Sequence, residues 1–185
     1  MDIVLASASP RRQELLAQMG LDFQVSPSQV DETLLPEFEP TAMAEQLALK
    51  KALAVAVQKS SSMLIIGADT IVCLKEQILG KPTDEQDAYR MITLLSNQWH
   101  QVITALALIQ DTKEIIAHEV TWVKMREILP EERLHYIQTG EPMDKAGAYA
   151  IQGYASQFIE EVKGNYNNVV GLPVNLLRQL LEYHF

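Results

Sequence analysis

LASASPRRQELLAQMG, residues 5–20, predicts the end of a buried strand, a turn of small hydroxyl residues and then a helix. Ser9 is a candidate N-cap, and Pro10 stands at the first helical position, where its missing N–H costs nothing. Arg11 and Arg12 follow in the first helical turn. The helix macrodipole disfavours cations at that end. A bound anion would explain why two arginines stand there.

Alternating apolar patterns along the remaining chain predict an α/β protein in a single domain over residues 1–185, with no linker or internal repeat. TDEQ, residues 83–86, resembles a capping box, and KGNYNN, residues 163–168, resembles a turn. Strands are predicted at 3–7, 22–28, 63–74, 76–82, 99–110, 114–125 and 157–162, and helices at 10–20, 41–58, 83–95, 130–140 and 173–185. Ligands of such mixed sheets gather at strand-to-helix turns.

Composition narrows the class of protein. A net charge of −9 argues against a nucleic-acid-binding surface, which is normally basic. The single cysteine, Cys73, excludes an intramolecular disulfide and a multi-cysteine zinc site, and it fits a reducing compartment. No apolar run approaches the ~20 residues of a membrane span, and no signal-peptide pattern precedes the first strand. We therefore expect a cytoplasmic protein that contacts neither nucleic acid nor membrane.

The turn before the first helix has two interpretations. Its backbone N–H groups and the helix dipole suit an anion, and Arg11 and Arg12 could add forked contacts to phosphate oxygens. Alternatively, the segment is an ordinary capped helix start with solvated arginines. No glycine-rich phosphate cradle decides between them.

Asp69 interrupts the apolar run IIGADTIV, in which a carboxylate is expensive unless it is paired, hydrogen-bonded or bound to metal. A functional carboxylate is the favoured interpretation. The alternative is a structural aspartate that accepts backbone hydrogen bonds at a bulge marked by Gly67.

Acidic and basic residues near these turns could complete a phosphate site. Asp31 and Glu32 could offer oxygen ligands to Mg²⁺, which often uses one or two carboxylates plus substrate phosphates, although a solvated acidic loop is the commoner role of such residues. Lys50 and Lys51 are adjacent on a helix, so at most one of them can face a site. Lys81, in a short G-K-P loop, could return to the Asp69 site or remain exposed. Together these residues suit phosphoryl or nucleotidyl chemistry.

Five segments, taken together, resemble the Maf family of nucleoside triphosphate pyrophosphatases. They are LASASPRRQELL, IIGADTIV, GKP, EPMDKAGAYAIQG and VVGLP, which follow the family's order from Leu5 to Pro173. The resemblance implies an α/β fold with a mixed twisted sheet, flanking helices and a central cleft, like that of the inosine triphosphate pyrophosphatases. It also implies hydrolysis of a nucleoside triphosphate to the monophosphate and pyrophosphate with a divalent cation, Mg²⁺ or Mn²⁺.

The resemblance carries roles onto particular residues. The presumed proton acceptor of G-A-D falls on Asp69, and Glu32 matches a metal ligand more loosely, so Glu32 and Asp69 are the expected metal ligands. The phosphate-contacting residues that it implies are Ser7, Arg11, Arg12, Lys51 and Lys81. The resemblance also allows a homodimer.

Three positions indicate the branch of the family. The branch acting on dTTP and UTP has arginine after S-P, threonine after the catalytic aspartate and glutamine in I-Q-G, as in Arg11, Thr70 and Gln152 here. The 7-methyl-GTP branch has tryptophan, glutamine and glutamate instead. The neutral amide of Gln152 can both donate and accept, which suits the imide edge of thymine or uracil.

Two alternatives accompany this hypothesis. The chain could be a pyrophosphatase for a different or modified nucleotide, in which case Gln152→Glu would change the substrate ranking. It could instead be a nucleotide-binding regulator of cell division, since the resembling family has been associated with septum formation. A regulator of that kind would bind nucleotide without turnover.

Overall fold

The computed structural model of the chain describes residues 2–33 and 39–185. Contacts divide the chain into two compact units, each described below by itself. Unit 1 comprises Met1–Thr70, Thr104–Glu119 and Gly171–Phe185, and unit 2 comprises Ile71–Ile103 and Val120–Val170. The single domain and the central cleft expected from the sequence stay predictions.

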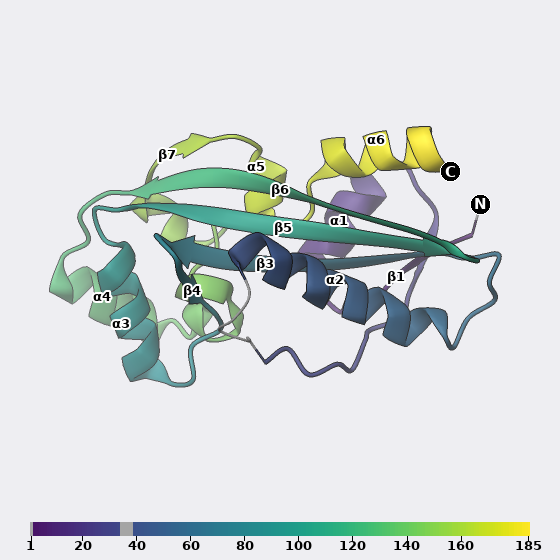
Figure 1. The fold of residues 1–185 in the computed structure, drawn as a ribbon. Coiled ribbons are helices and arrows are strands. Elements are labelled where there is room, and N and C mark those ends of the chain that lie inside the picture. The colour runs from purple at the N-terminus through teal and green to yellow at the C-terminus, as the bar shows by residue number, and fades with distance from the viewer. Residues whose placement is uncertain (1, 34–38) are drawn as a thin grey trace. The chain divides into compact units, whose positions relative to one another are not determined.

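Seven strands form one mixed sheet in the order β2-β1-β3-β5-β6-β7, with β4 paired to β3 (Figure 1). β1 pairs in parallel with β2 and β3, whereas the β3–β4 and β6–β7 pairs are antiparallel. The strands are β1 (Ile3–Leu5), β2 (Phe23–Val25), β3 (Leu64–Leu74), β4 (Gln77–Leu79), β5 (Trp99–Gln110), β6 (Lys113–Met125) and β7 (Ile159–Lys163). The predicted mixed sheet is confirmed.

Helices alternate with the strands and flank the sheet, as the sequence predicts. They are α1 (Pro10–Gln18), α2 (Pro40–Ala56), α3 (Glu85–Leu95), α4 (Pro130–Gln138), α5 (Tyr166–Val170) and α6 (Val174–His184). Short 3₁₀ helices occupy the E-P-M-D-K-A-G-A-Y-A-I-Q-G region and its continuation: η1 (Glu141–Asp144), η2 (Ala146–Ala148) and η3 (Tyr154–Phe158). No helix in the described parts of the chain combines the length and the apolar character that a membrane crossing requires.

In unit 1, α2 packs closely on β3. A Cβ added at Gly67 of β3 would lie 2.3 Å from the carbonyl oxygen of Ala48 and 2.8 Å from the Cβ of Ala52. Glycine at this position therefore lets the helix approach the strand, and it marks no bulge, because β3 runs unbroken from Leu64 to Leu74. This close approach fixes the position of Lys51 on α2 relative to Asp69 on β3.

Unit 2 has its own hydrophobic core, in which α3 and α4 pack with the η segments and the strand ends. Its aromatic part comprises Tyr136, Tyr154 and Phe158, with Tyr136 stacked on Tyr154 and edge-on to Phe158. Tyr136 and Phe158 are fully buried. This cluster ties α4 to the η3 segment that follows Gln152.

Two local predictions were wrong. The N-cap of α3 is Asp84 rather than Thr83, and its side chain accepts from the backbone N–H of Asp87 over 2.7 Å. Aspartate is as good an N-cap as threonine, so the sequence motif alone did not decide which of the two neighbouring residues caps the helix. The predicted turn at 163–168 contains the start of α5, which begins at Tyr166.

Candidate active site

Asp69 lies on β3 with only 6% of its surface exposed. Its Oδ1 accepts a hydrogen bond from Nζ of Lys51 over 2.5 Å, and Lys51 is itself only 7% exposed. Burying a carboxylate is tolerable only with such a partner. The ion pair with Lys51 thus offsets the cost of burying the Asp69 carboxylate in a core strand, as the sequence led us to expect.

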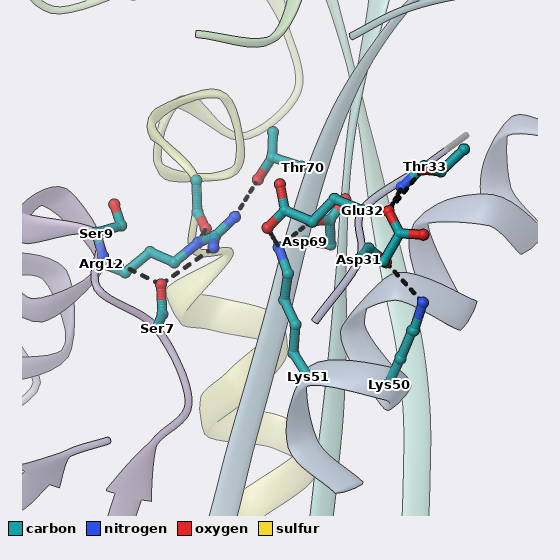
Figure 2. A network of polar contacts seen from close by, with 11 residues as sticks. Ser7, Ser9, Arg12, Asp31, Glu32, Thr33, Lys50, Lys51, Asp69 and Thr70 are labelled. Atoms are coloured by element: carbon teal, nitrogen blue, oxygen red, sulfur yellow. Dashed lines mark hydrogen bonds and ion pairs between the residues drawn. The ribbon is translucent and has the colours of Figure 1, made fainter. Parts of the chain in front are cut away.

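The two adjacent lysines of α2 point in different directions, as helical geometry predicts (Figure 2). Lys51 faces β3, whereas Lys50 donates to the backbone oxygen of Asp31 at the surface over 2.6 Å. Asp31 itself accepts from the hydroxyl and the backbone N–H of Thr33, and these hydrogen bonds lower the pKa of its carboxyl group.

Glu32 is the second carboxylate at the Lys51 ammonium. Its Oε1 lies 2.6 Å from Nζ of Lys51, and its side chain is 38% exposed. Two carboxylates from distant segments therefore converge on one cation, as Figure 2 shows. Glu37 lies in residues 34–38, outside the described residues, whereas Glu39 is exposed at the start of α2.

The oxygen donors of Glu32 and Asp69 suit a hard divalent cation. Within residues 2–33 and 39–185, no group of three or more His, Cys, Asp or Glu side chains is arranged to hold a metal. Two carboxylates are nevertheless a sufficient protein contribution for Mg²⁺ when substrate phosphates and water complete the coordination. Their convergence on one ammonium shows that the pair can surround a positive charge.

Arg12 is held by three parts of unit 1. Its Nε donates to the backbone oxygen of Gly171 over 2.8 Å, Nη1 to Oγ of Ser7 over 3.3 Å and Nη2 to Oγ1 of Thr70 over 3.0 Å. Burial lowers the pKa of Arg12, while the negative charges of Asp69 and Glu32 oppose that shift. The guanidinium keeps further N–H groups that these three bonds leave available.

The turn before α1 is organised by Ser7 rather than by Ser9. Ser9 occupies the N-cap position of α1, but its side chain makes no capping hydrogen bond. Instead, its backbone N–H donates to Oγ of Ser7 over 3.2 Å, and the same oxygen accepts from Arg12. The predicted residue Ser7 is therefore both buried and in contact with a predicted phosphate ligand.

Thr104 on β5 belongs to this network, although sequence reasoning missed it. Its hydroxyl lies 2.9 Å from that of Thr70, and the Thr104 side chain is fully buried. A lone threonine in an apolar strand is an ordinary β-former, so only the pairing of β3 with β5 reveals it. Gly171 was also missed as the acceptor for Arg12, even though VVGLP was recognised as a motif.

Unit 1 thus brings together six of the predicted site residues through contacts: Ser7, Arg12, Glu32, Lys51, Asp69 and Thr70. Arg11 is half-buried beside Arg12, and its charge contributes to lowering the pKa of Arg12. Lys81 and Gln152 are exposed residues of unit 2, and their predicted roles stay predictions.

A family model described as Maf-like protein matches residues 2–184 of the chain. The chain belongs to the Maf family. A dTTP/UTP pyrophosphatase of Aquifex aeolicus is 42% identical over 98% of this chain and 95% of its own length. A second relative of the same name, from Alkaliphilus oremlandii, is 47% identical over 99% and 96% of the two lengths.

Solved structures of other proteins share the fold of this Maf chain. A nucleoside-triphosphatase described as a dITP/XTP pyrophosphatase, from Mycobacterium abscessus, superposes with a TM-score of 0.51 at 13% identity, over 100% of this chain and 99% of that one. The Ham1 protein of Staphylococcus aureus gives a TM-score of 0.54 at 16% identity over 98% of both chains. The predicted likeness in fold is confirmed.

Proposed function

We propose that the chain hydrolyses nucleoside triphosphates, preferably dTTP and UTP, to the nucleoside monophosphate and pyrophosphate. The observation that carries this proposal is the buried Asp69 carboxylate, paired with Lys51 and adjoining the arginine turn of α1. The names of the relatives from Aquifex aeolicus and Alkaliphilus oremlandii supply the substrate class.

Asp69 is the proton acceptor in this proposal. Oδ1 is engaged by Lys51, and among the described residues Oδ2 has no hydrogen-bond partner, so Oδ2 is the oxygen that takes the proton. A water molecule attacks the α- or the β-phosphorus, its proton passes to Asp69, and the P–O bond of the bridging oxygen between these phosphorus atoms breaks. The products are the monophosphate and pyrophosphate, and the carboxyl proton then returns to solvent.

The cations of the site neutralise the triphosphate. Arg12 has N–H groups left over from its internal bonds, and the Lys51 ammonium has a third N–H beyond the two that face Asp69 and Glu32. Arg11, Lys81 and the Ser7 turn complete the proposed phosphate contacts. Bound phosphates would also explain why Arg11 and Arg12 stand at the N-terminus of a helix. Their negative charge would offset the unfavourable interaction of the arginines with the helix dipole.

Glu32 and Asp69 are the residues that would hold a divalent cation, Mg²⁺ or Mn²⁺. Such an ion supplies charge neutralisation on the phosphates and on the departing pyrophosphate. Lys51 serves the same two carboxylates as a counter-ion and keeps them close together. The carboxylates are thereby arranged before any substrate binds.

Thr70 and Gln152 are the proposed base-discriminating residues. The Thr70 hydroxyl accepts from Arg12 and pairs with Thr104, so we assign it to fixing the arginine as well as to shaping the pocket. The amide of Gln152 offers one donor and one acceptor to the imide edge of uracil or thymine. A cytoplasmic location and a homodimer stay predictions.

The test is pyrophosphate release from dTTP, UTP, CTP, GTP, ATP, ITP and 7-methyl-GTP with Mg²⁺ or Mn²⁺. We expect turnover concentrated on dTTP and UTP. A different ranking would favour the alternative of another nucleotide, and Gln152→Glu should then alter that ranking. Binding without turnover of any nucleotide would contradict the enzyme and favour a nucleotide-binding regulator of cell division.

A further inference from the structure

Gln152 directly follows a buried stretch of the chain, residues 147–151. Its neighbour Ile151 is 6% exposed and Tyr149 is 5% exposed, whereas Gln152 is exposed to solvent. Gly153 follows with a φ of +112°, which turns the chain into η3. The direction of the Gln152 side chain therefore depends on what holds this segment within unit 2.

Glu141 holds the segment directly after Gln152. Its Oε2 accepts from the backbone N–H of Tyr154 over 2.8 Å, and its Oε1 accepts from the backbone N–H of Ala155 over 3.3 Å. These are the first N–H groups of η3, which have no partner within the helix. A carboxylate eleven residues earlier in sequence than Gln152 thus anchors the backbone that carries it.

One further hydrogen bond fixes the Glu141 carboxylate, and the missing side chain of Gly153 leaves room for it. Oε1 also accepts from the hydroxyl of Tyr136 over 3.1 Å, and burial together with Glu141 raises the pKa of Tyr136, so this hydroxyl stays a donor. A Cβ at Gly153 would lie 2.7 Å from Oε2 of Glu141. A side chain at position 153 would displace the Glu141 carboxylate from its present place, so glycine next to Gln152 favours this contact.

The other end of the segment is anchored independently. The Tyr149 hydroxyl lies 2.7 Å from Nε2 of His100, and both side chains are buried. The rings meet edge-on, with their centroids 5.4 Å apart. Residues 150–153 are thus held at one end by the Tyr149–His100 contact and at the other by the hydrogen bonds of Glu141 to η3.

We propose that Glu141 is a positioning residue for base discrimination, because it fixes the backbone from which the Gln152 amide meets the nucleobase. This inference rests on the proposed function. Glu141 touches no reacting atom in the proposed reaction. Its loss therefore weakens the preference for one base edge over another and leaves the chemistry at Asp69 intact.

The test compares UTP with CTP, which share sugar and triphosphate but exchange donors and acceptors on the base edge. Glu141→Gln keeps the shape of the side chain but replaces one acceptor oxygen with an NH₂ group, which cannot accept from a backbone N–H. We expect the UTP:CTP ratio of kcat/KM to fall about three- to tenfold, the equivalent of one net hydrogen bond, through a higher KM for UTP at a nearly unchanged kcat. Glu160→Gln, an exposed residue of the same unit, is the matched control and should leave the ratio unchanged.

Coupling to Gln152 separates positioning from general destabilisation. In a Gln152→Ala background, Glu141→Gln should cause no further loss of the UTP:CTP ratio, because its effect acts through the missing amide. The backbone amides of Tyr154 and Ala155 should also exchange faster with deuterium in Glu141→Gln. An unchanged ratio, an effect additive with Gln152→Ala, or unchanged amide exchange would each overturn the proposal.

Failure of the proposed function remains distinguishable from failure of this inference. If the wild-type protein released no pyrophosphate from UTP or CTP, the proposed activity would be wrong. The role of Glu141 would then be decided by calorimetric dissociation constants for the two nucleotides, which need no turnover. A UTP preference that Glu141→Gln removes would support it, and equal binding in the wild type, or a preference that survives the substitution, would overturn it.

Discussion

Replacing Lys51 with methionine should destabilise the protein far more than the same change at Lys50. Lys51→Met keeps the length and apolar stem of the side chain but removes the ammonium that Asp69 contacts over 2.5 Å. Asp69, which is 6% exposed, would then retain its charge with no partner at that distance. Removing one member of a buried ion pair typically costs about 3–5 kcal/mol.

The contact with Glu32 adds little to that figure. Its side chain is 38% exposed, and exposed ion pairs contribute about 0–1 kcal/mol. Lys51→Met should therefore lower the free energy of unfolding by about 4 kcal/mol, almost all of it through Asp69. Adding Asp69→Asn should restore most of the loss, because the buried group then carries no charge.

Urea denaturation of the wild type, the two single variants and the double variant measures these differences from the transition midpoints. Lys50→Met is the control, since Lys50 is exposed and bonds to a backbone oxygen at the surface, and it should change stability by about 0.5 kcal/mol or less. A loss below about 1 kcal/mol for Lys51→Met, or no rescue by Asp69→Asn, would refute the buried-pair argument.

Three further predictions follow from contacts in the two units. Gly67→Ala places a Cβ 2.3 Å from the Ala48 carbonyl oxygen and should cost about 3 kcal/mol in urea denaturation, more than the ~1 kcal/mol for Gly20→Ala, where φ is +74° but space is open. Arg12→Lys keeps the charge but loses the forked contacts, so it should cost about 2 kcal/mol of stability and lower kcat/KM for UTP; unchanged values would contradict the assigned bonds. Burial lowers the pKa of His100 to about 4 from its ordinary 6.5. Between these two pH values the unfolded chain binds a proton at His100 and the folded chain does not. The free energy of unfolding should therefore fall by about 3 kcal/mol as the pH is lowered from 6.5 to 4. His100→Gln should remove that part of the pH dependence, measured as unfolding free energy against pH, and an unaltered slope would contradict it.

Local signals predicted most of the elements because they act within a few residues. Pro10 and Gly20 bracket α1, which runs Pro10–Gln18, and the i, i+1 geometry of a helix correctly separated Lys50 from Lys51. The same kind of signal failed where two neighbours were equally suitable. Thr83 and Asp84 are both good caps, and the structure uses Asp84.

The long-range partners in the site could not be predicted from pattern alone. Arg12 and the Gly171 carbonyl are 159 residues apart, and Thr104 resembles any β-branched residue of an apolar strand. Burial did predict that Asp69 needs a compensating partner, but only the packing of α2 on β3 identifies Lys51 as that partner. The resemblance to the Maf family assigned Lys51 to the substrate phosphates and did not predict its pairing with Asp69.

The most direct test of the proposed activity is pyrophosphate release from UTP by the wild type and by Asp69→Asn, beside calorimetric binding of UTP to both. The proposal predicts that the wild type yields UMP and pyrophosphate in equal amounts. It also predicts that Asp69→Asn binds UTP but loses turnover by about 100-fold or more, as expected for removal of a proton acceptor. An Asp69→Asn protein as active as the wild type, or a wild type that binds UTP and releases no pyrophosphate, would contradict it.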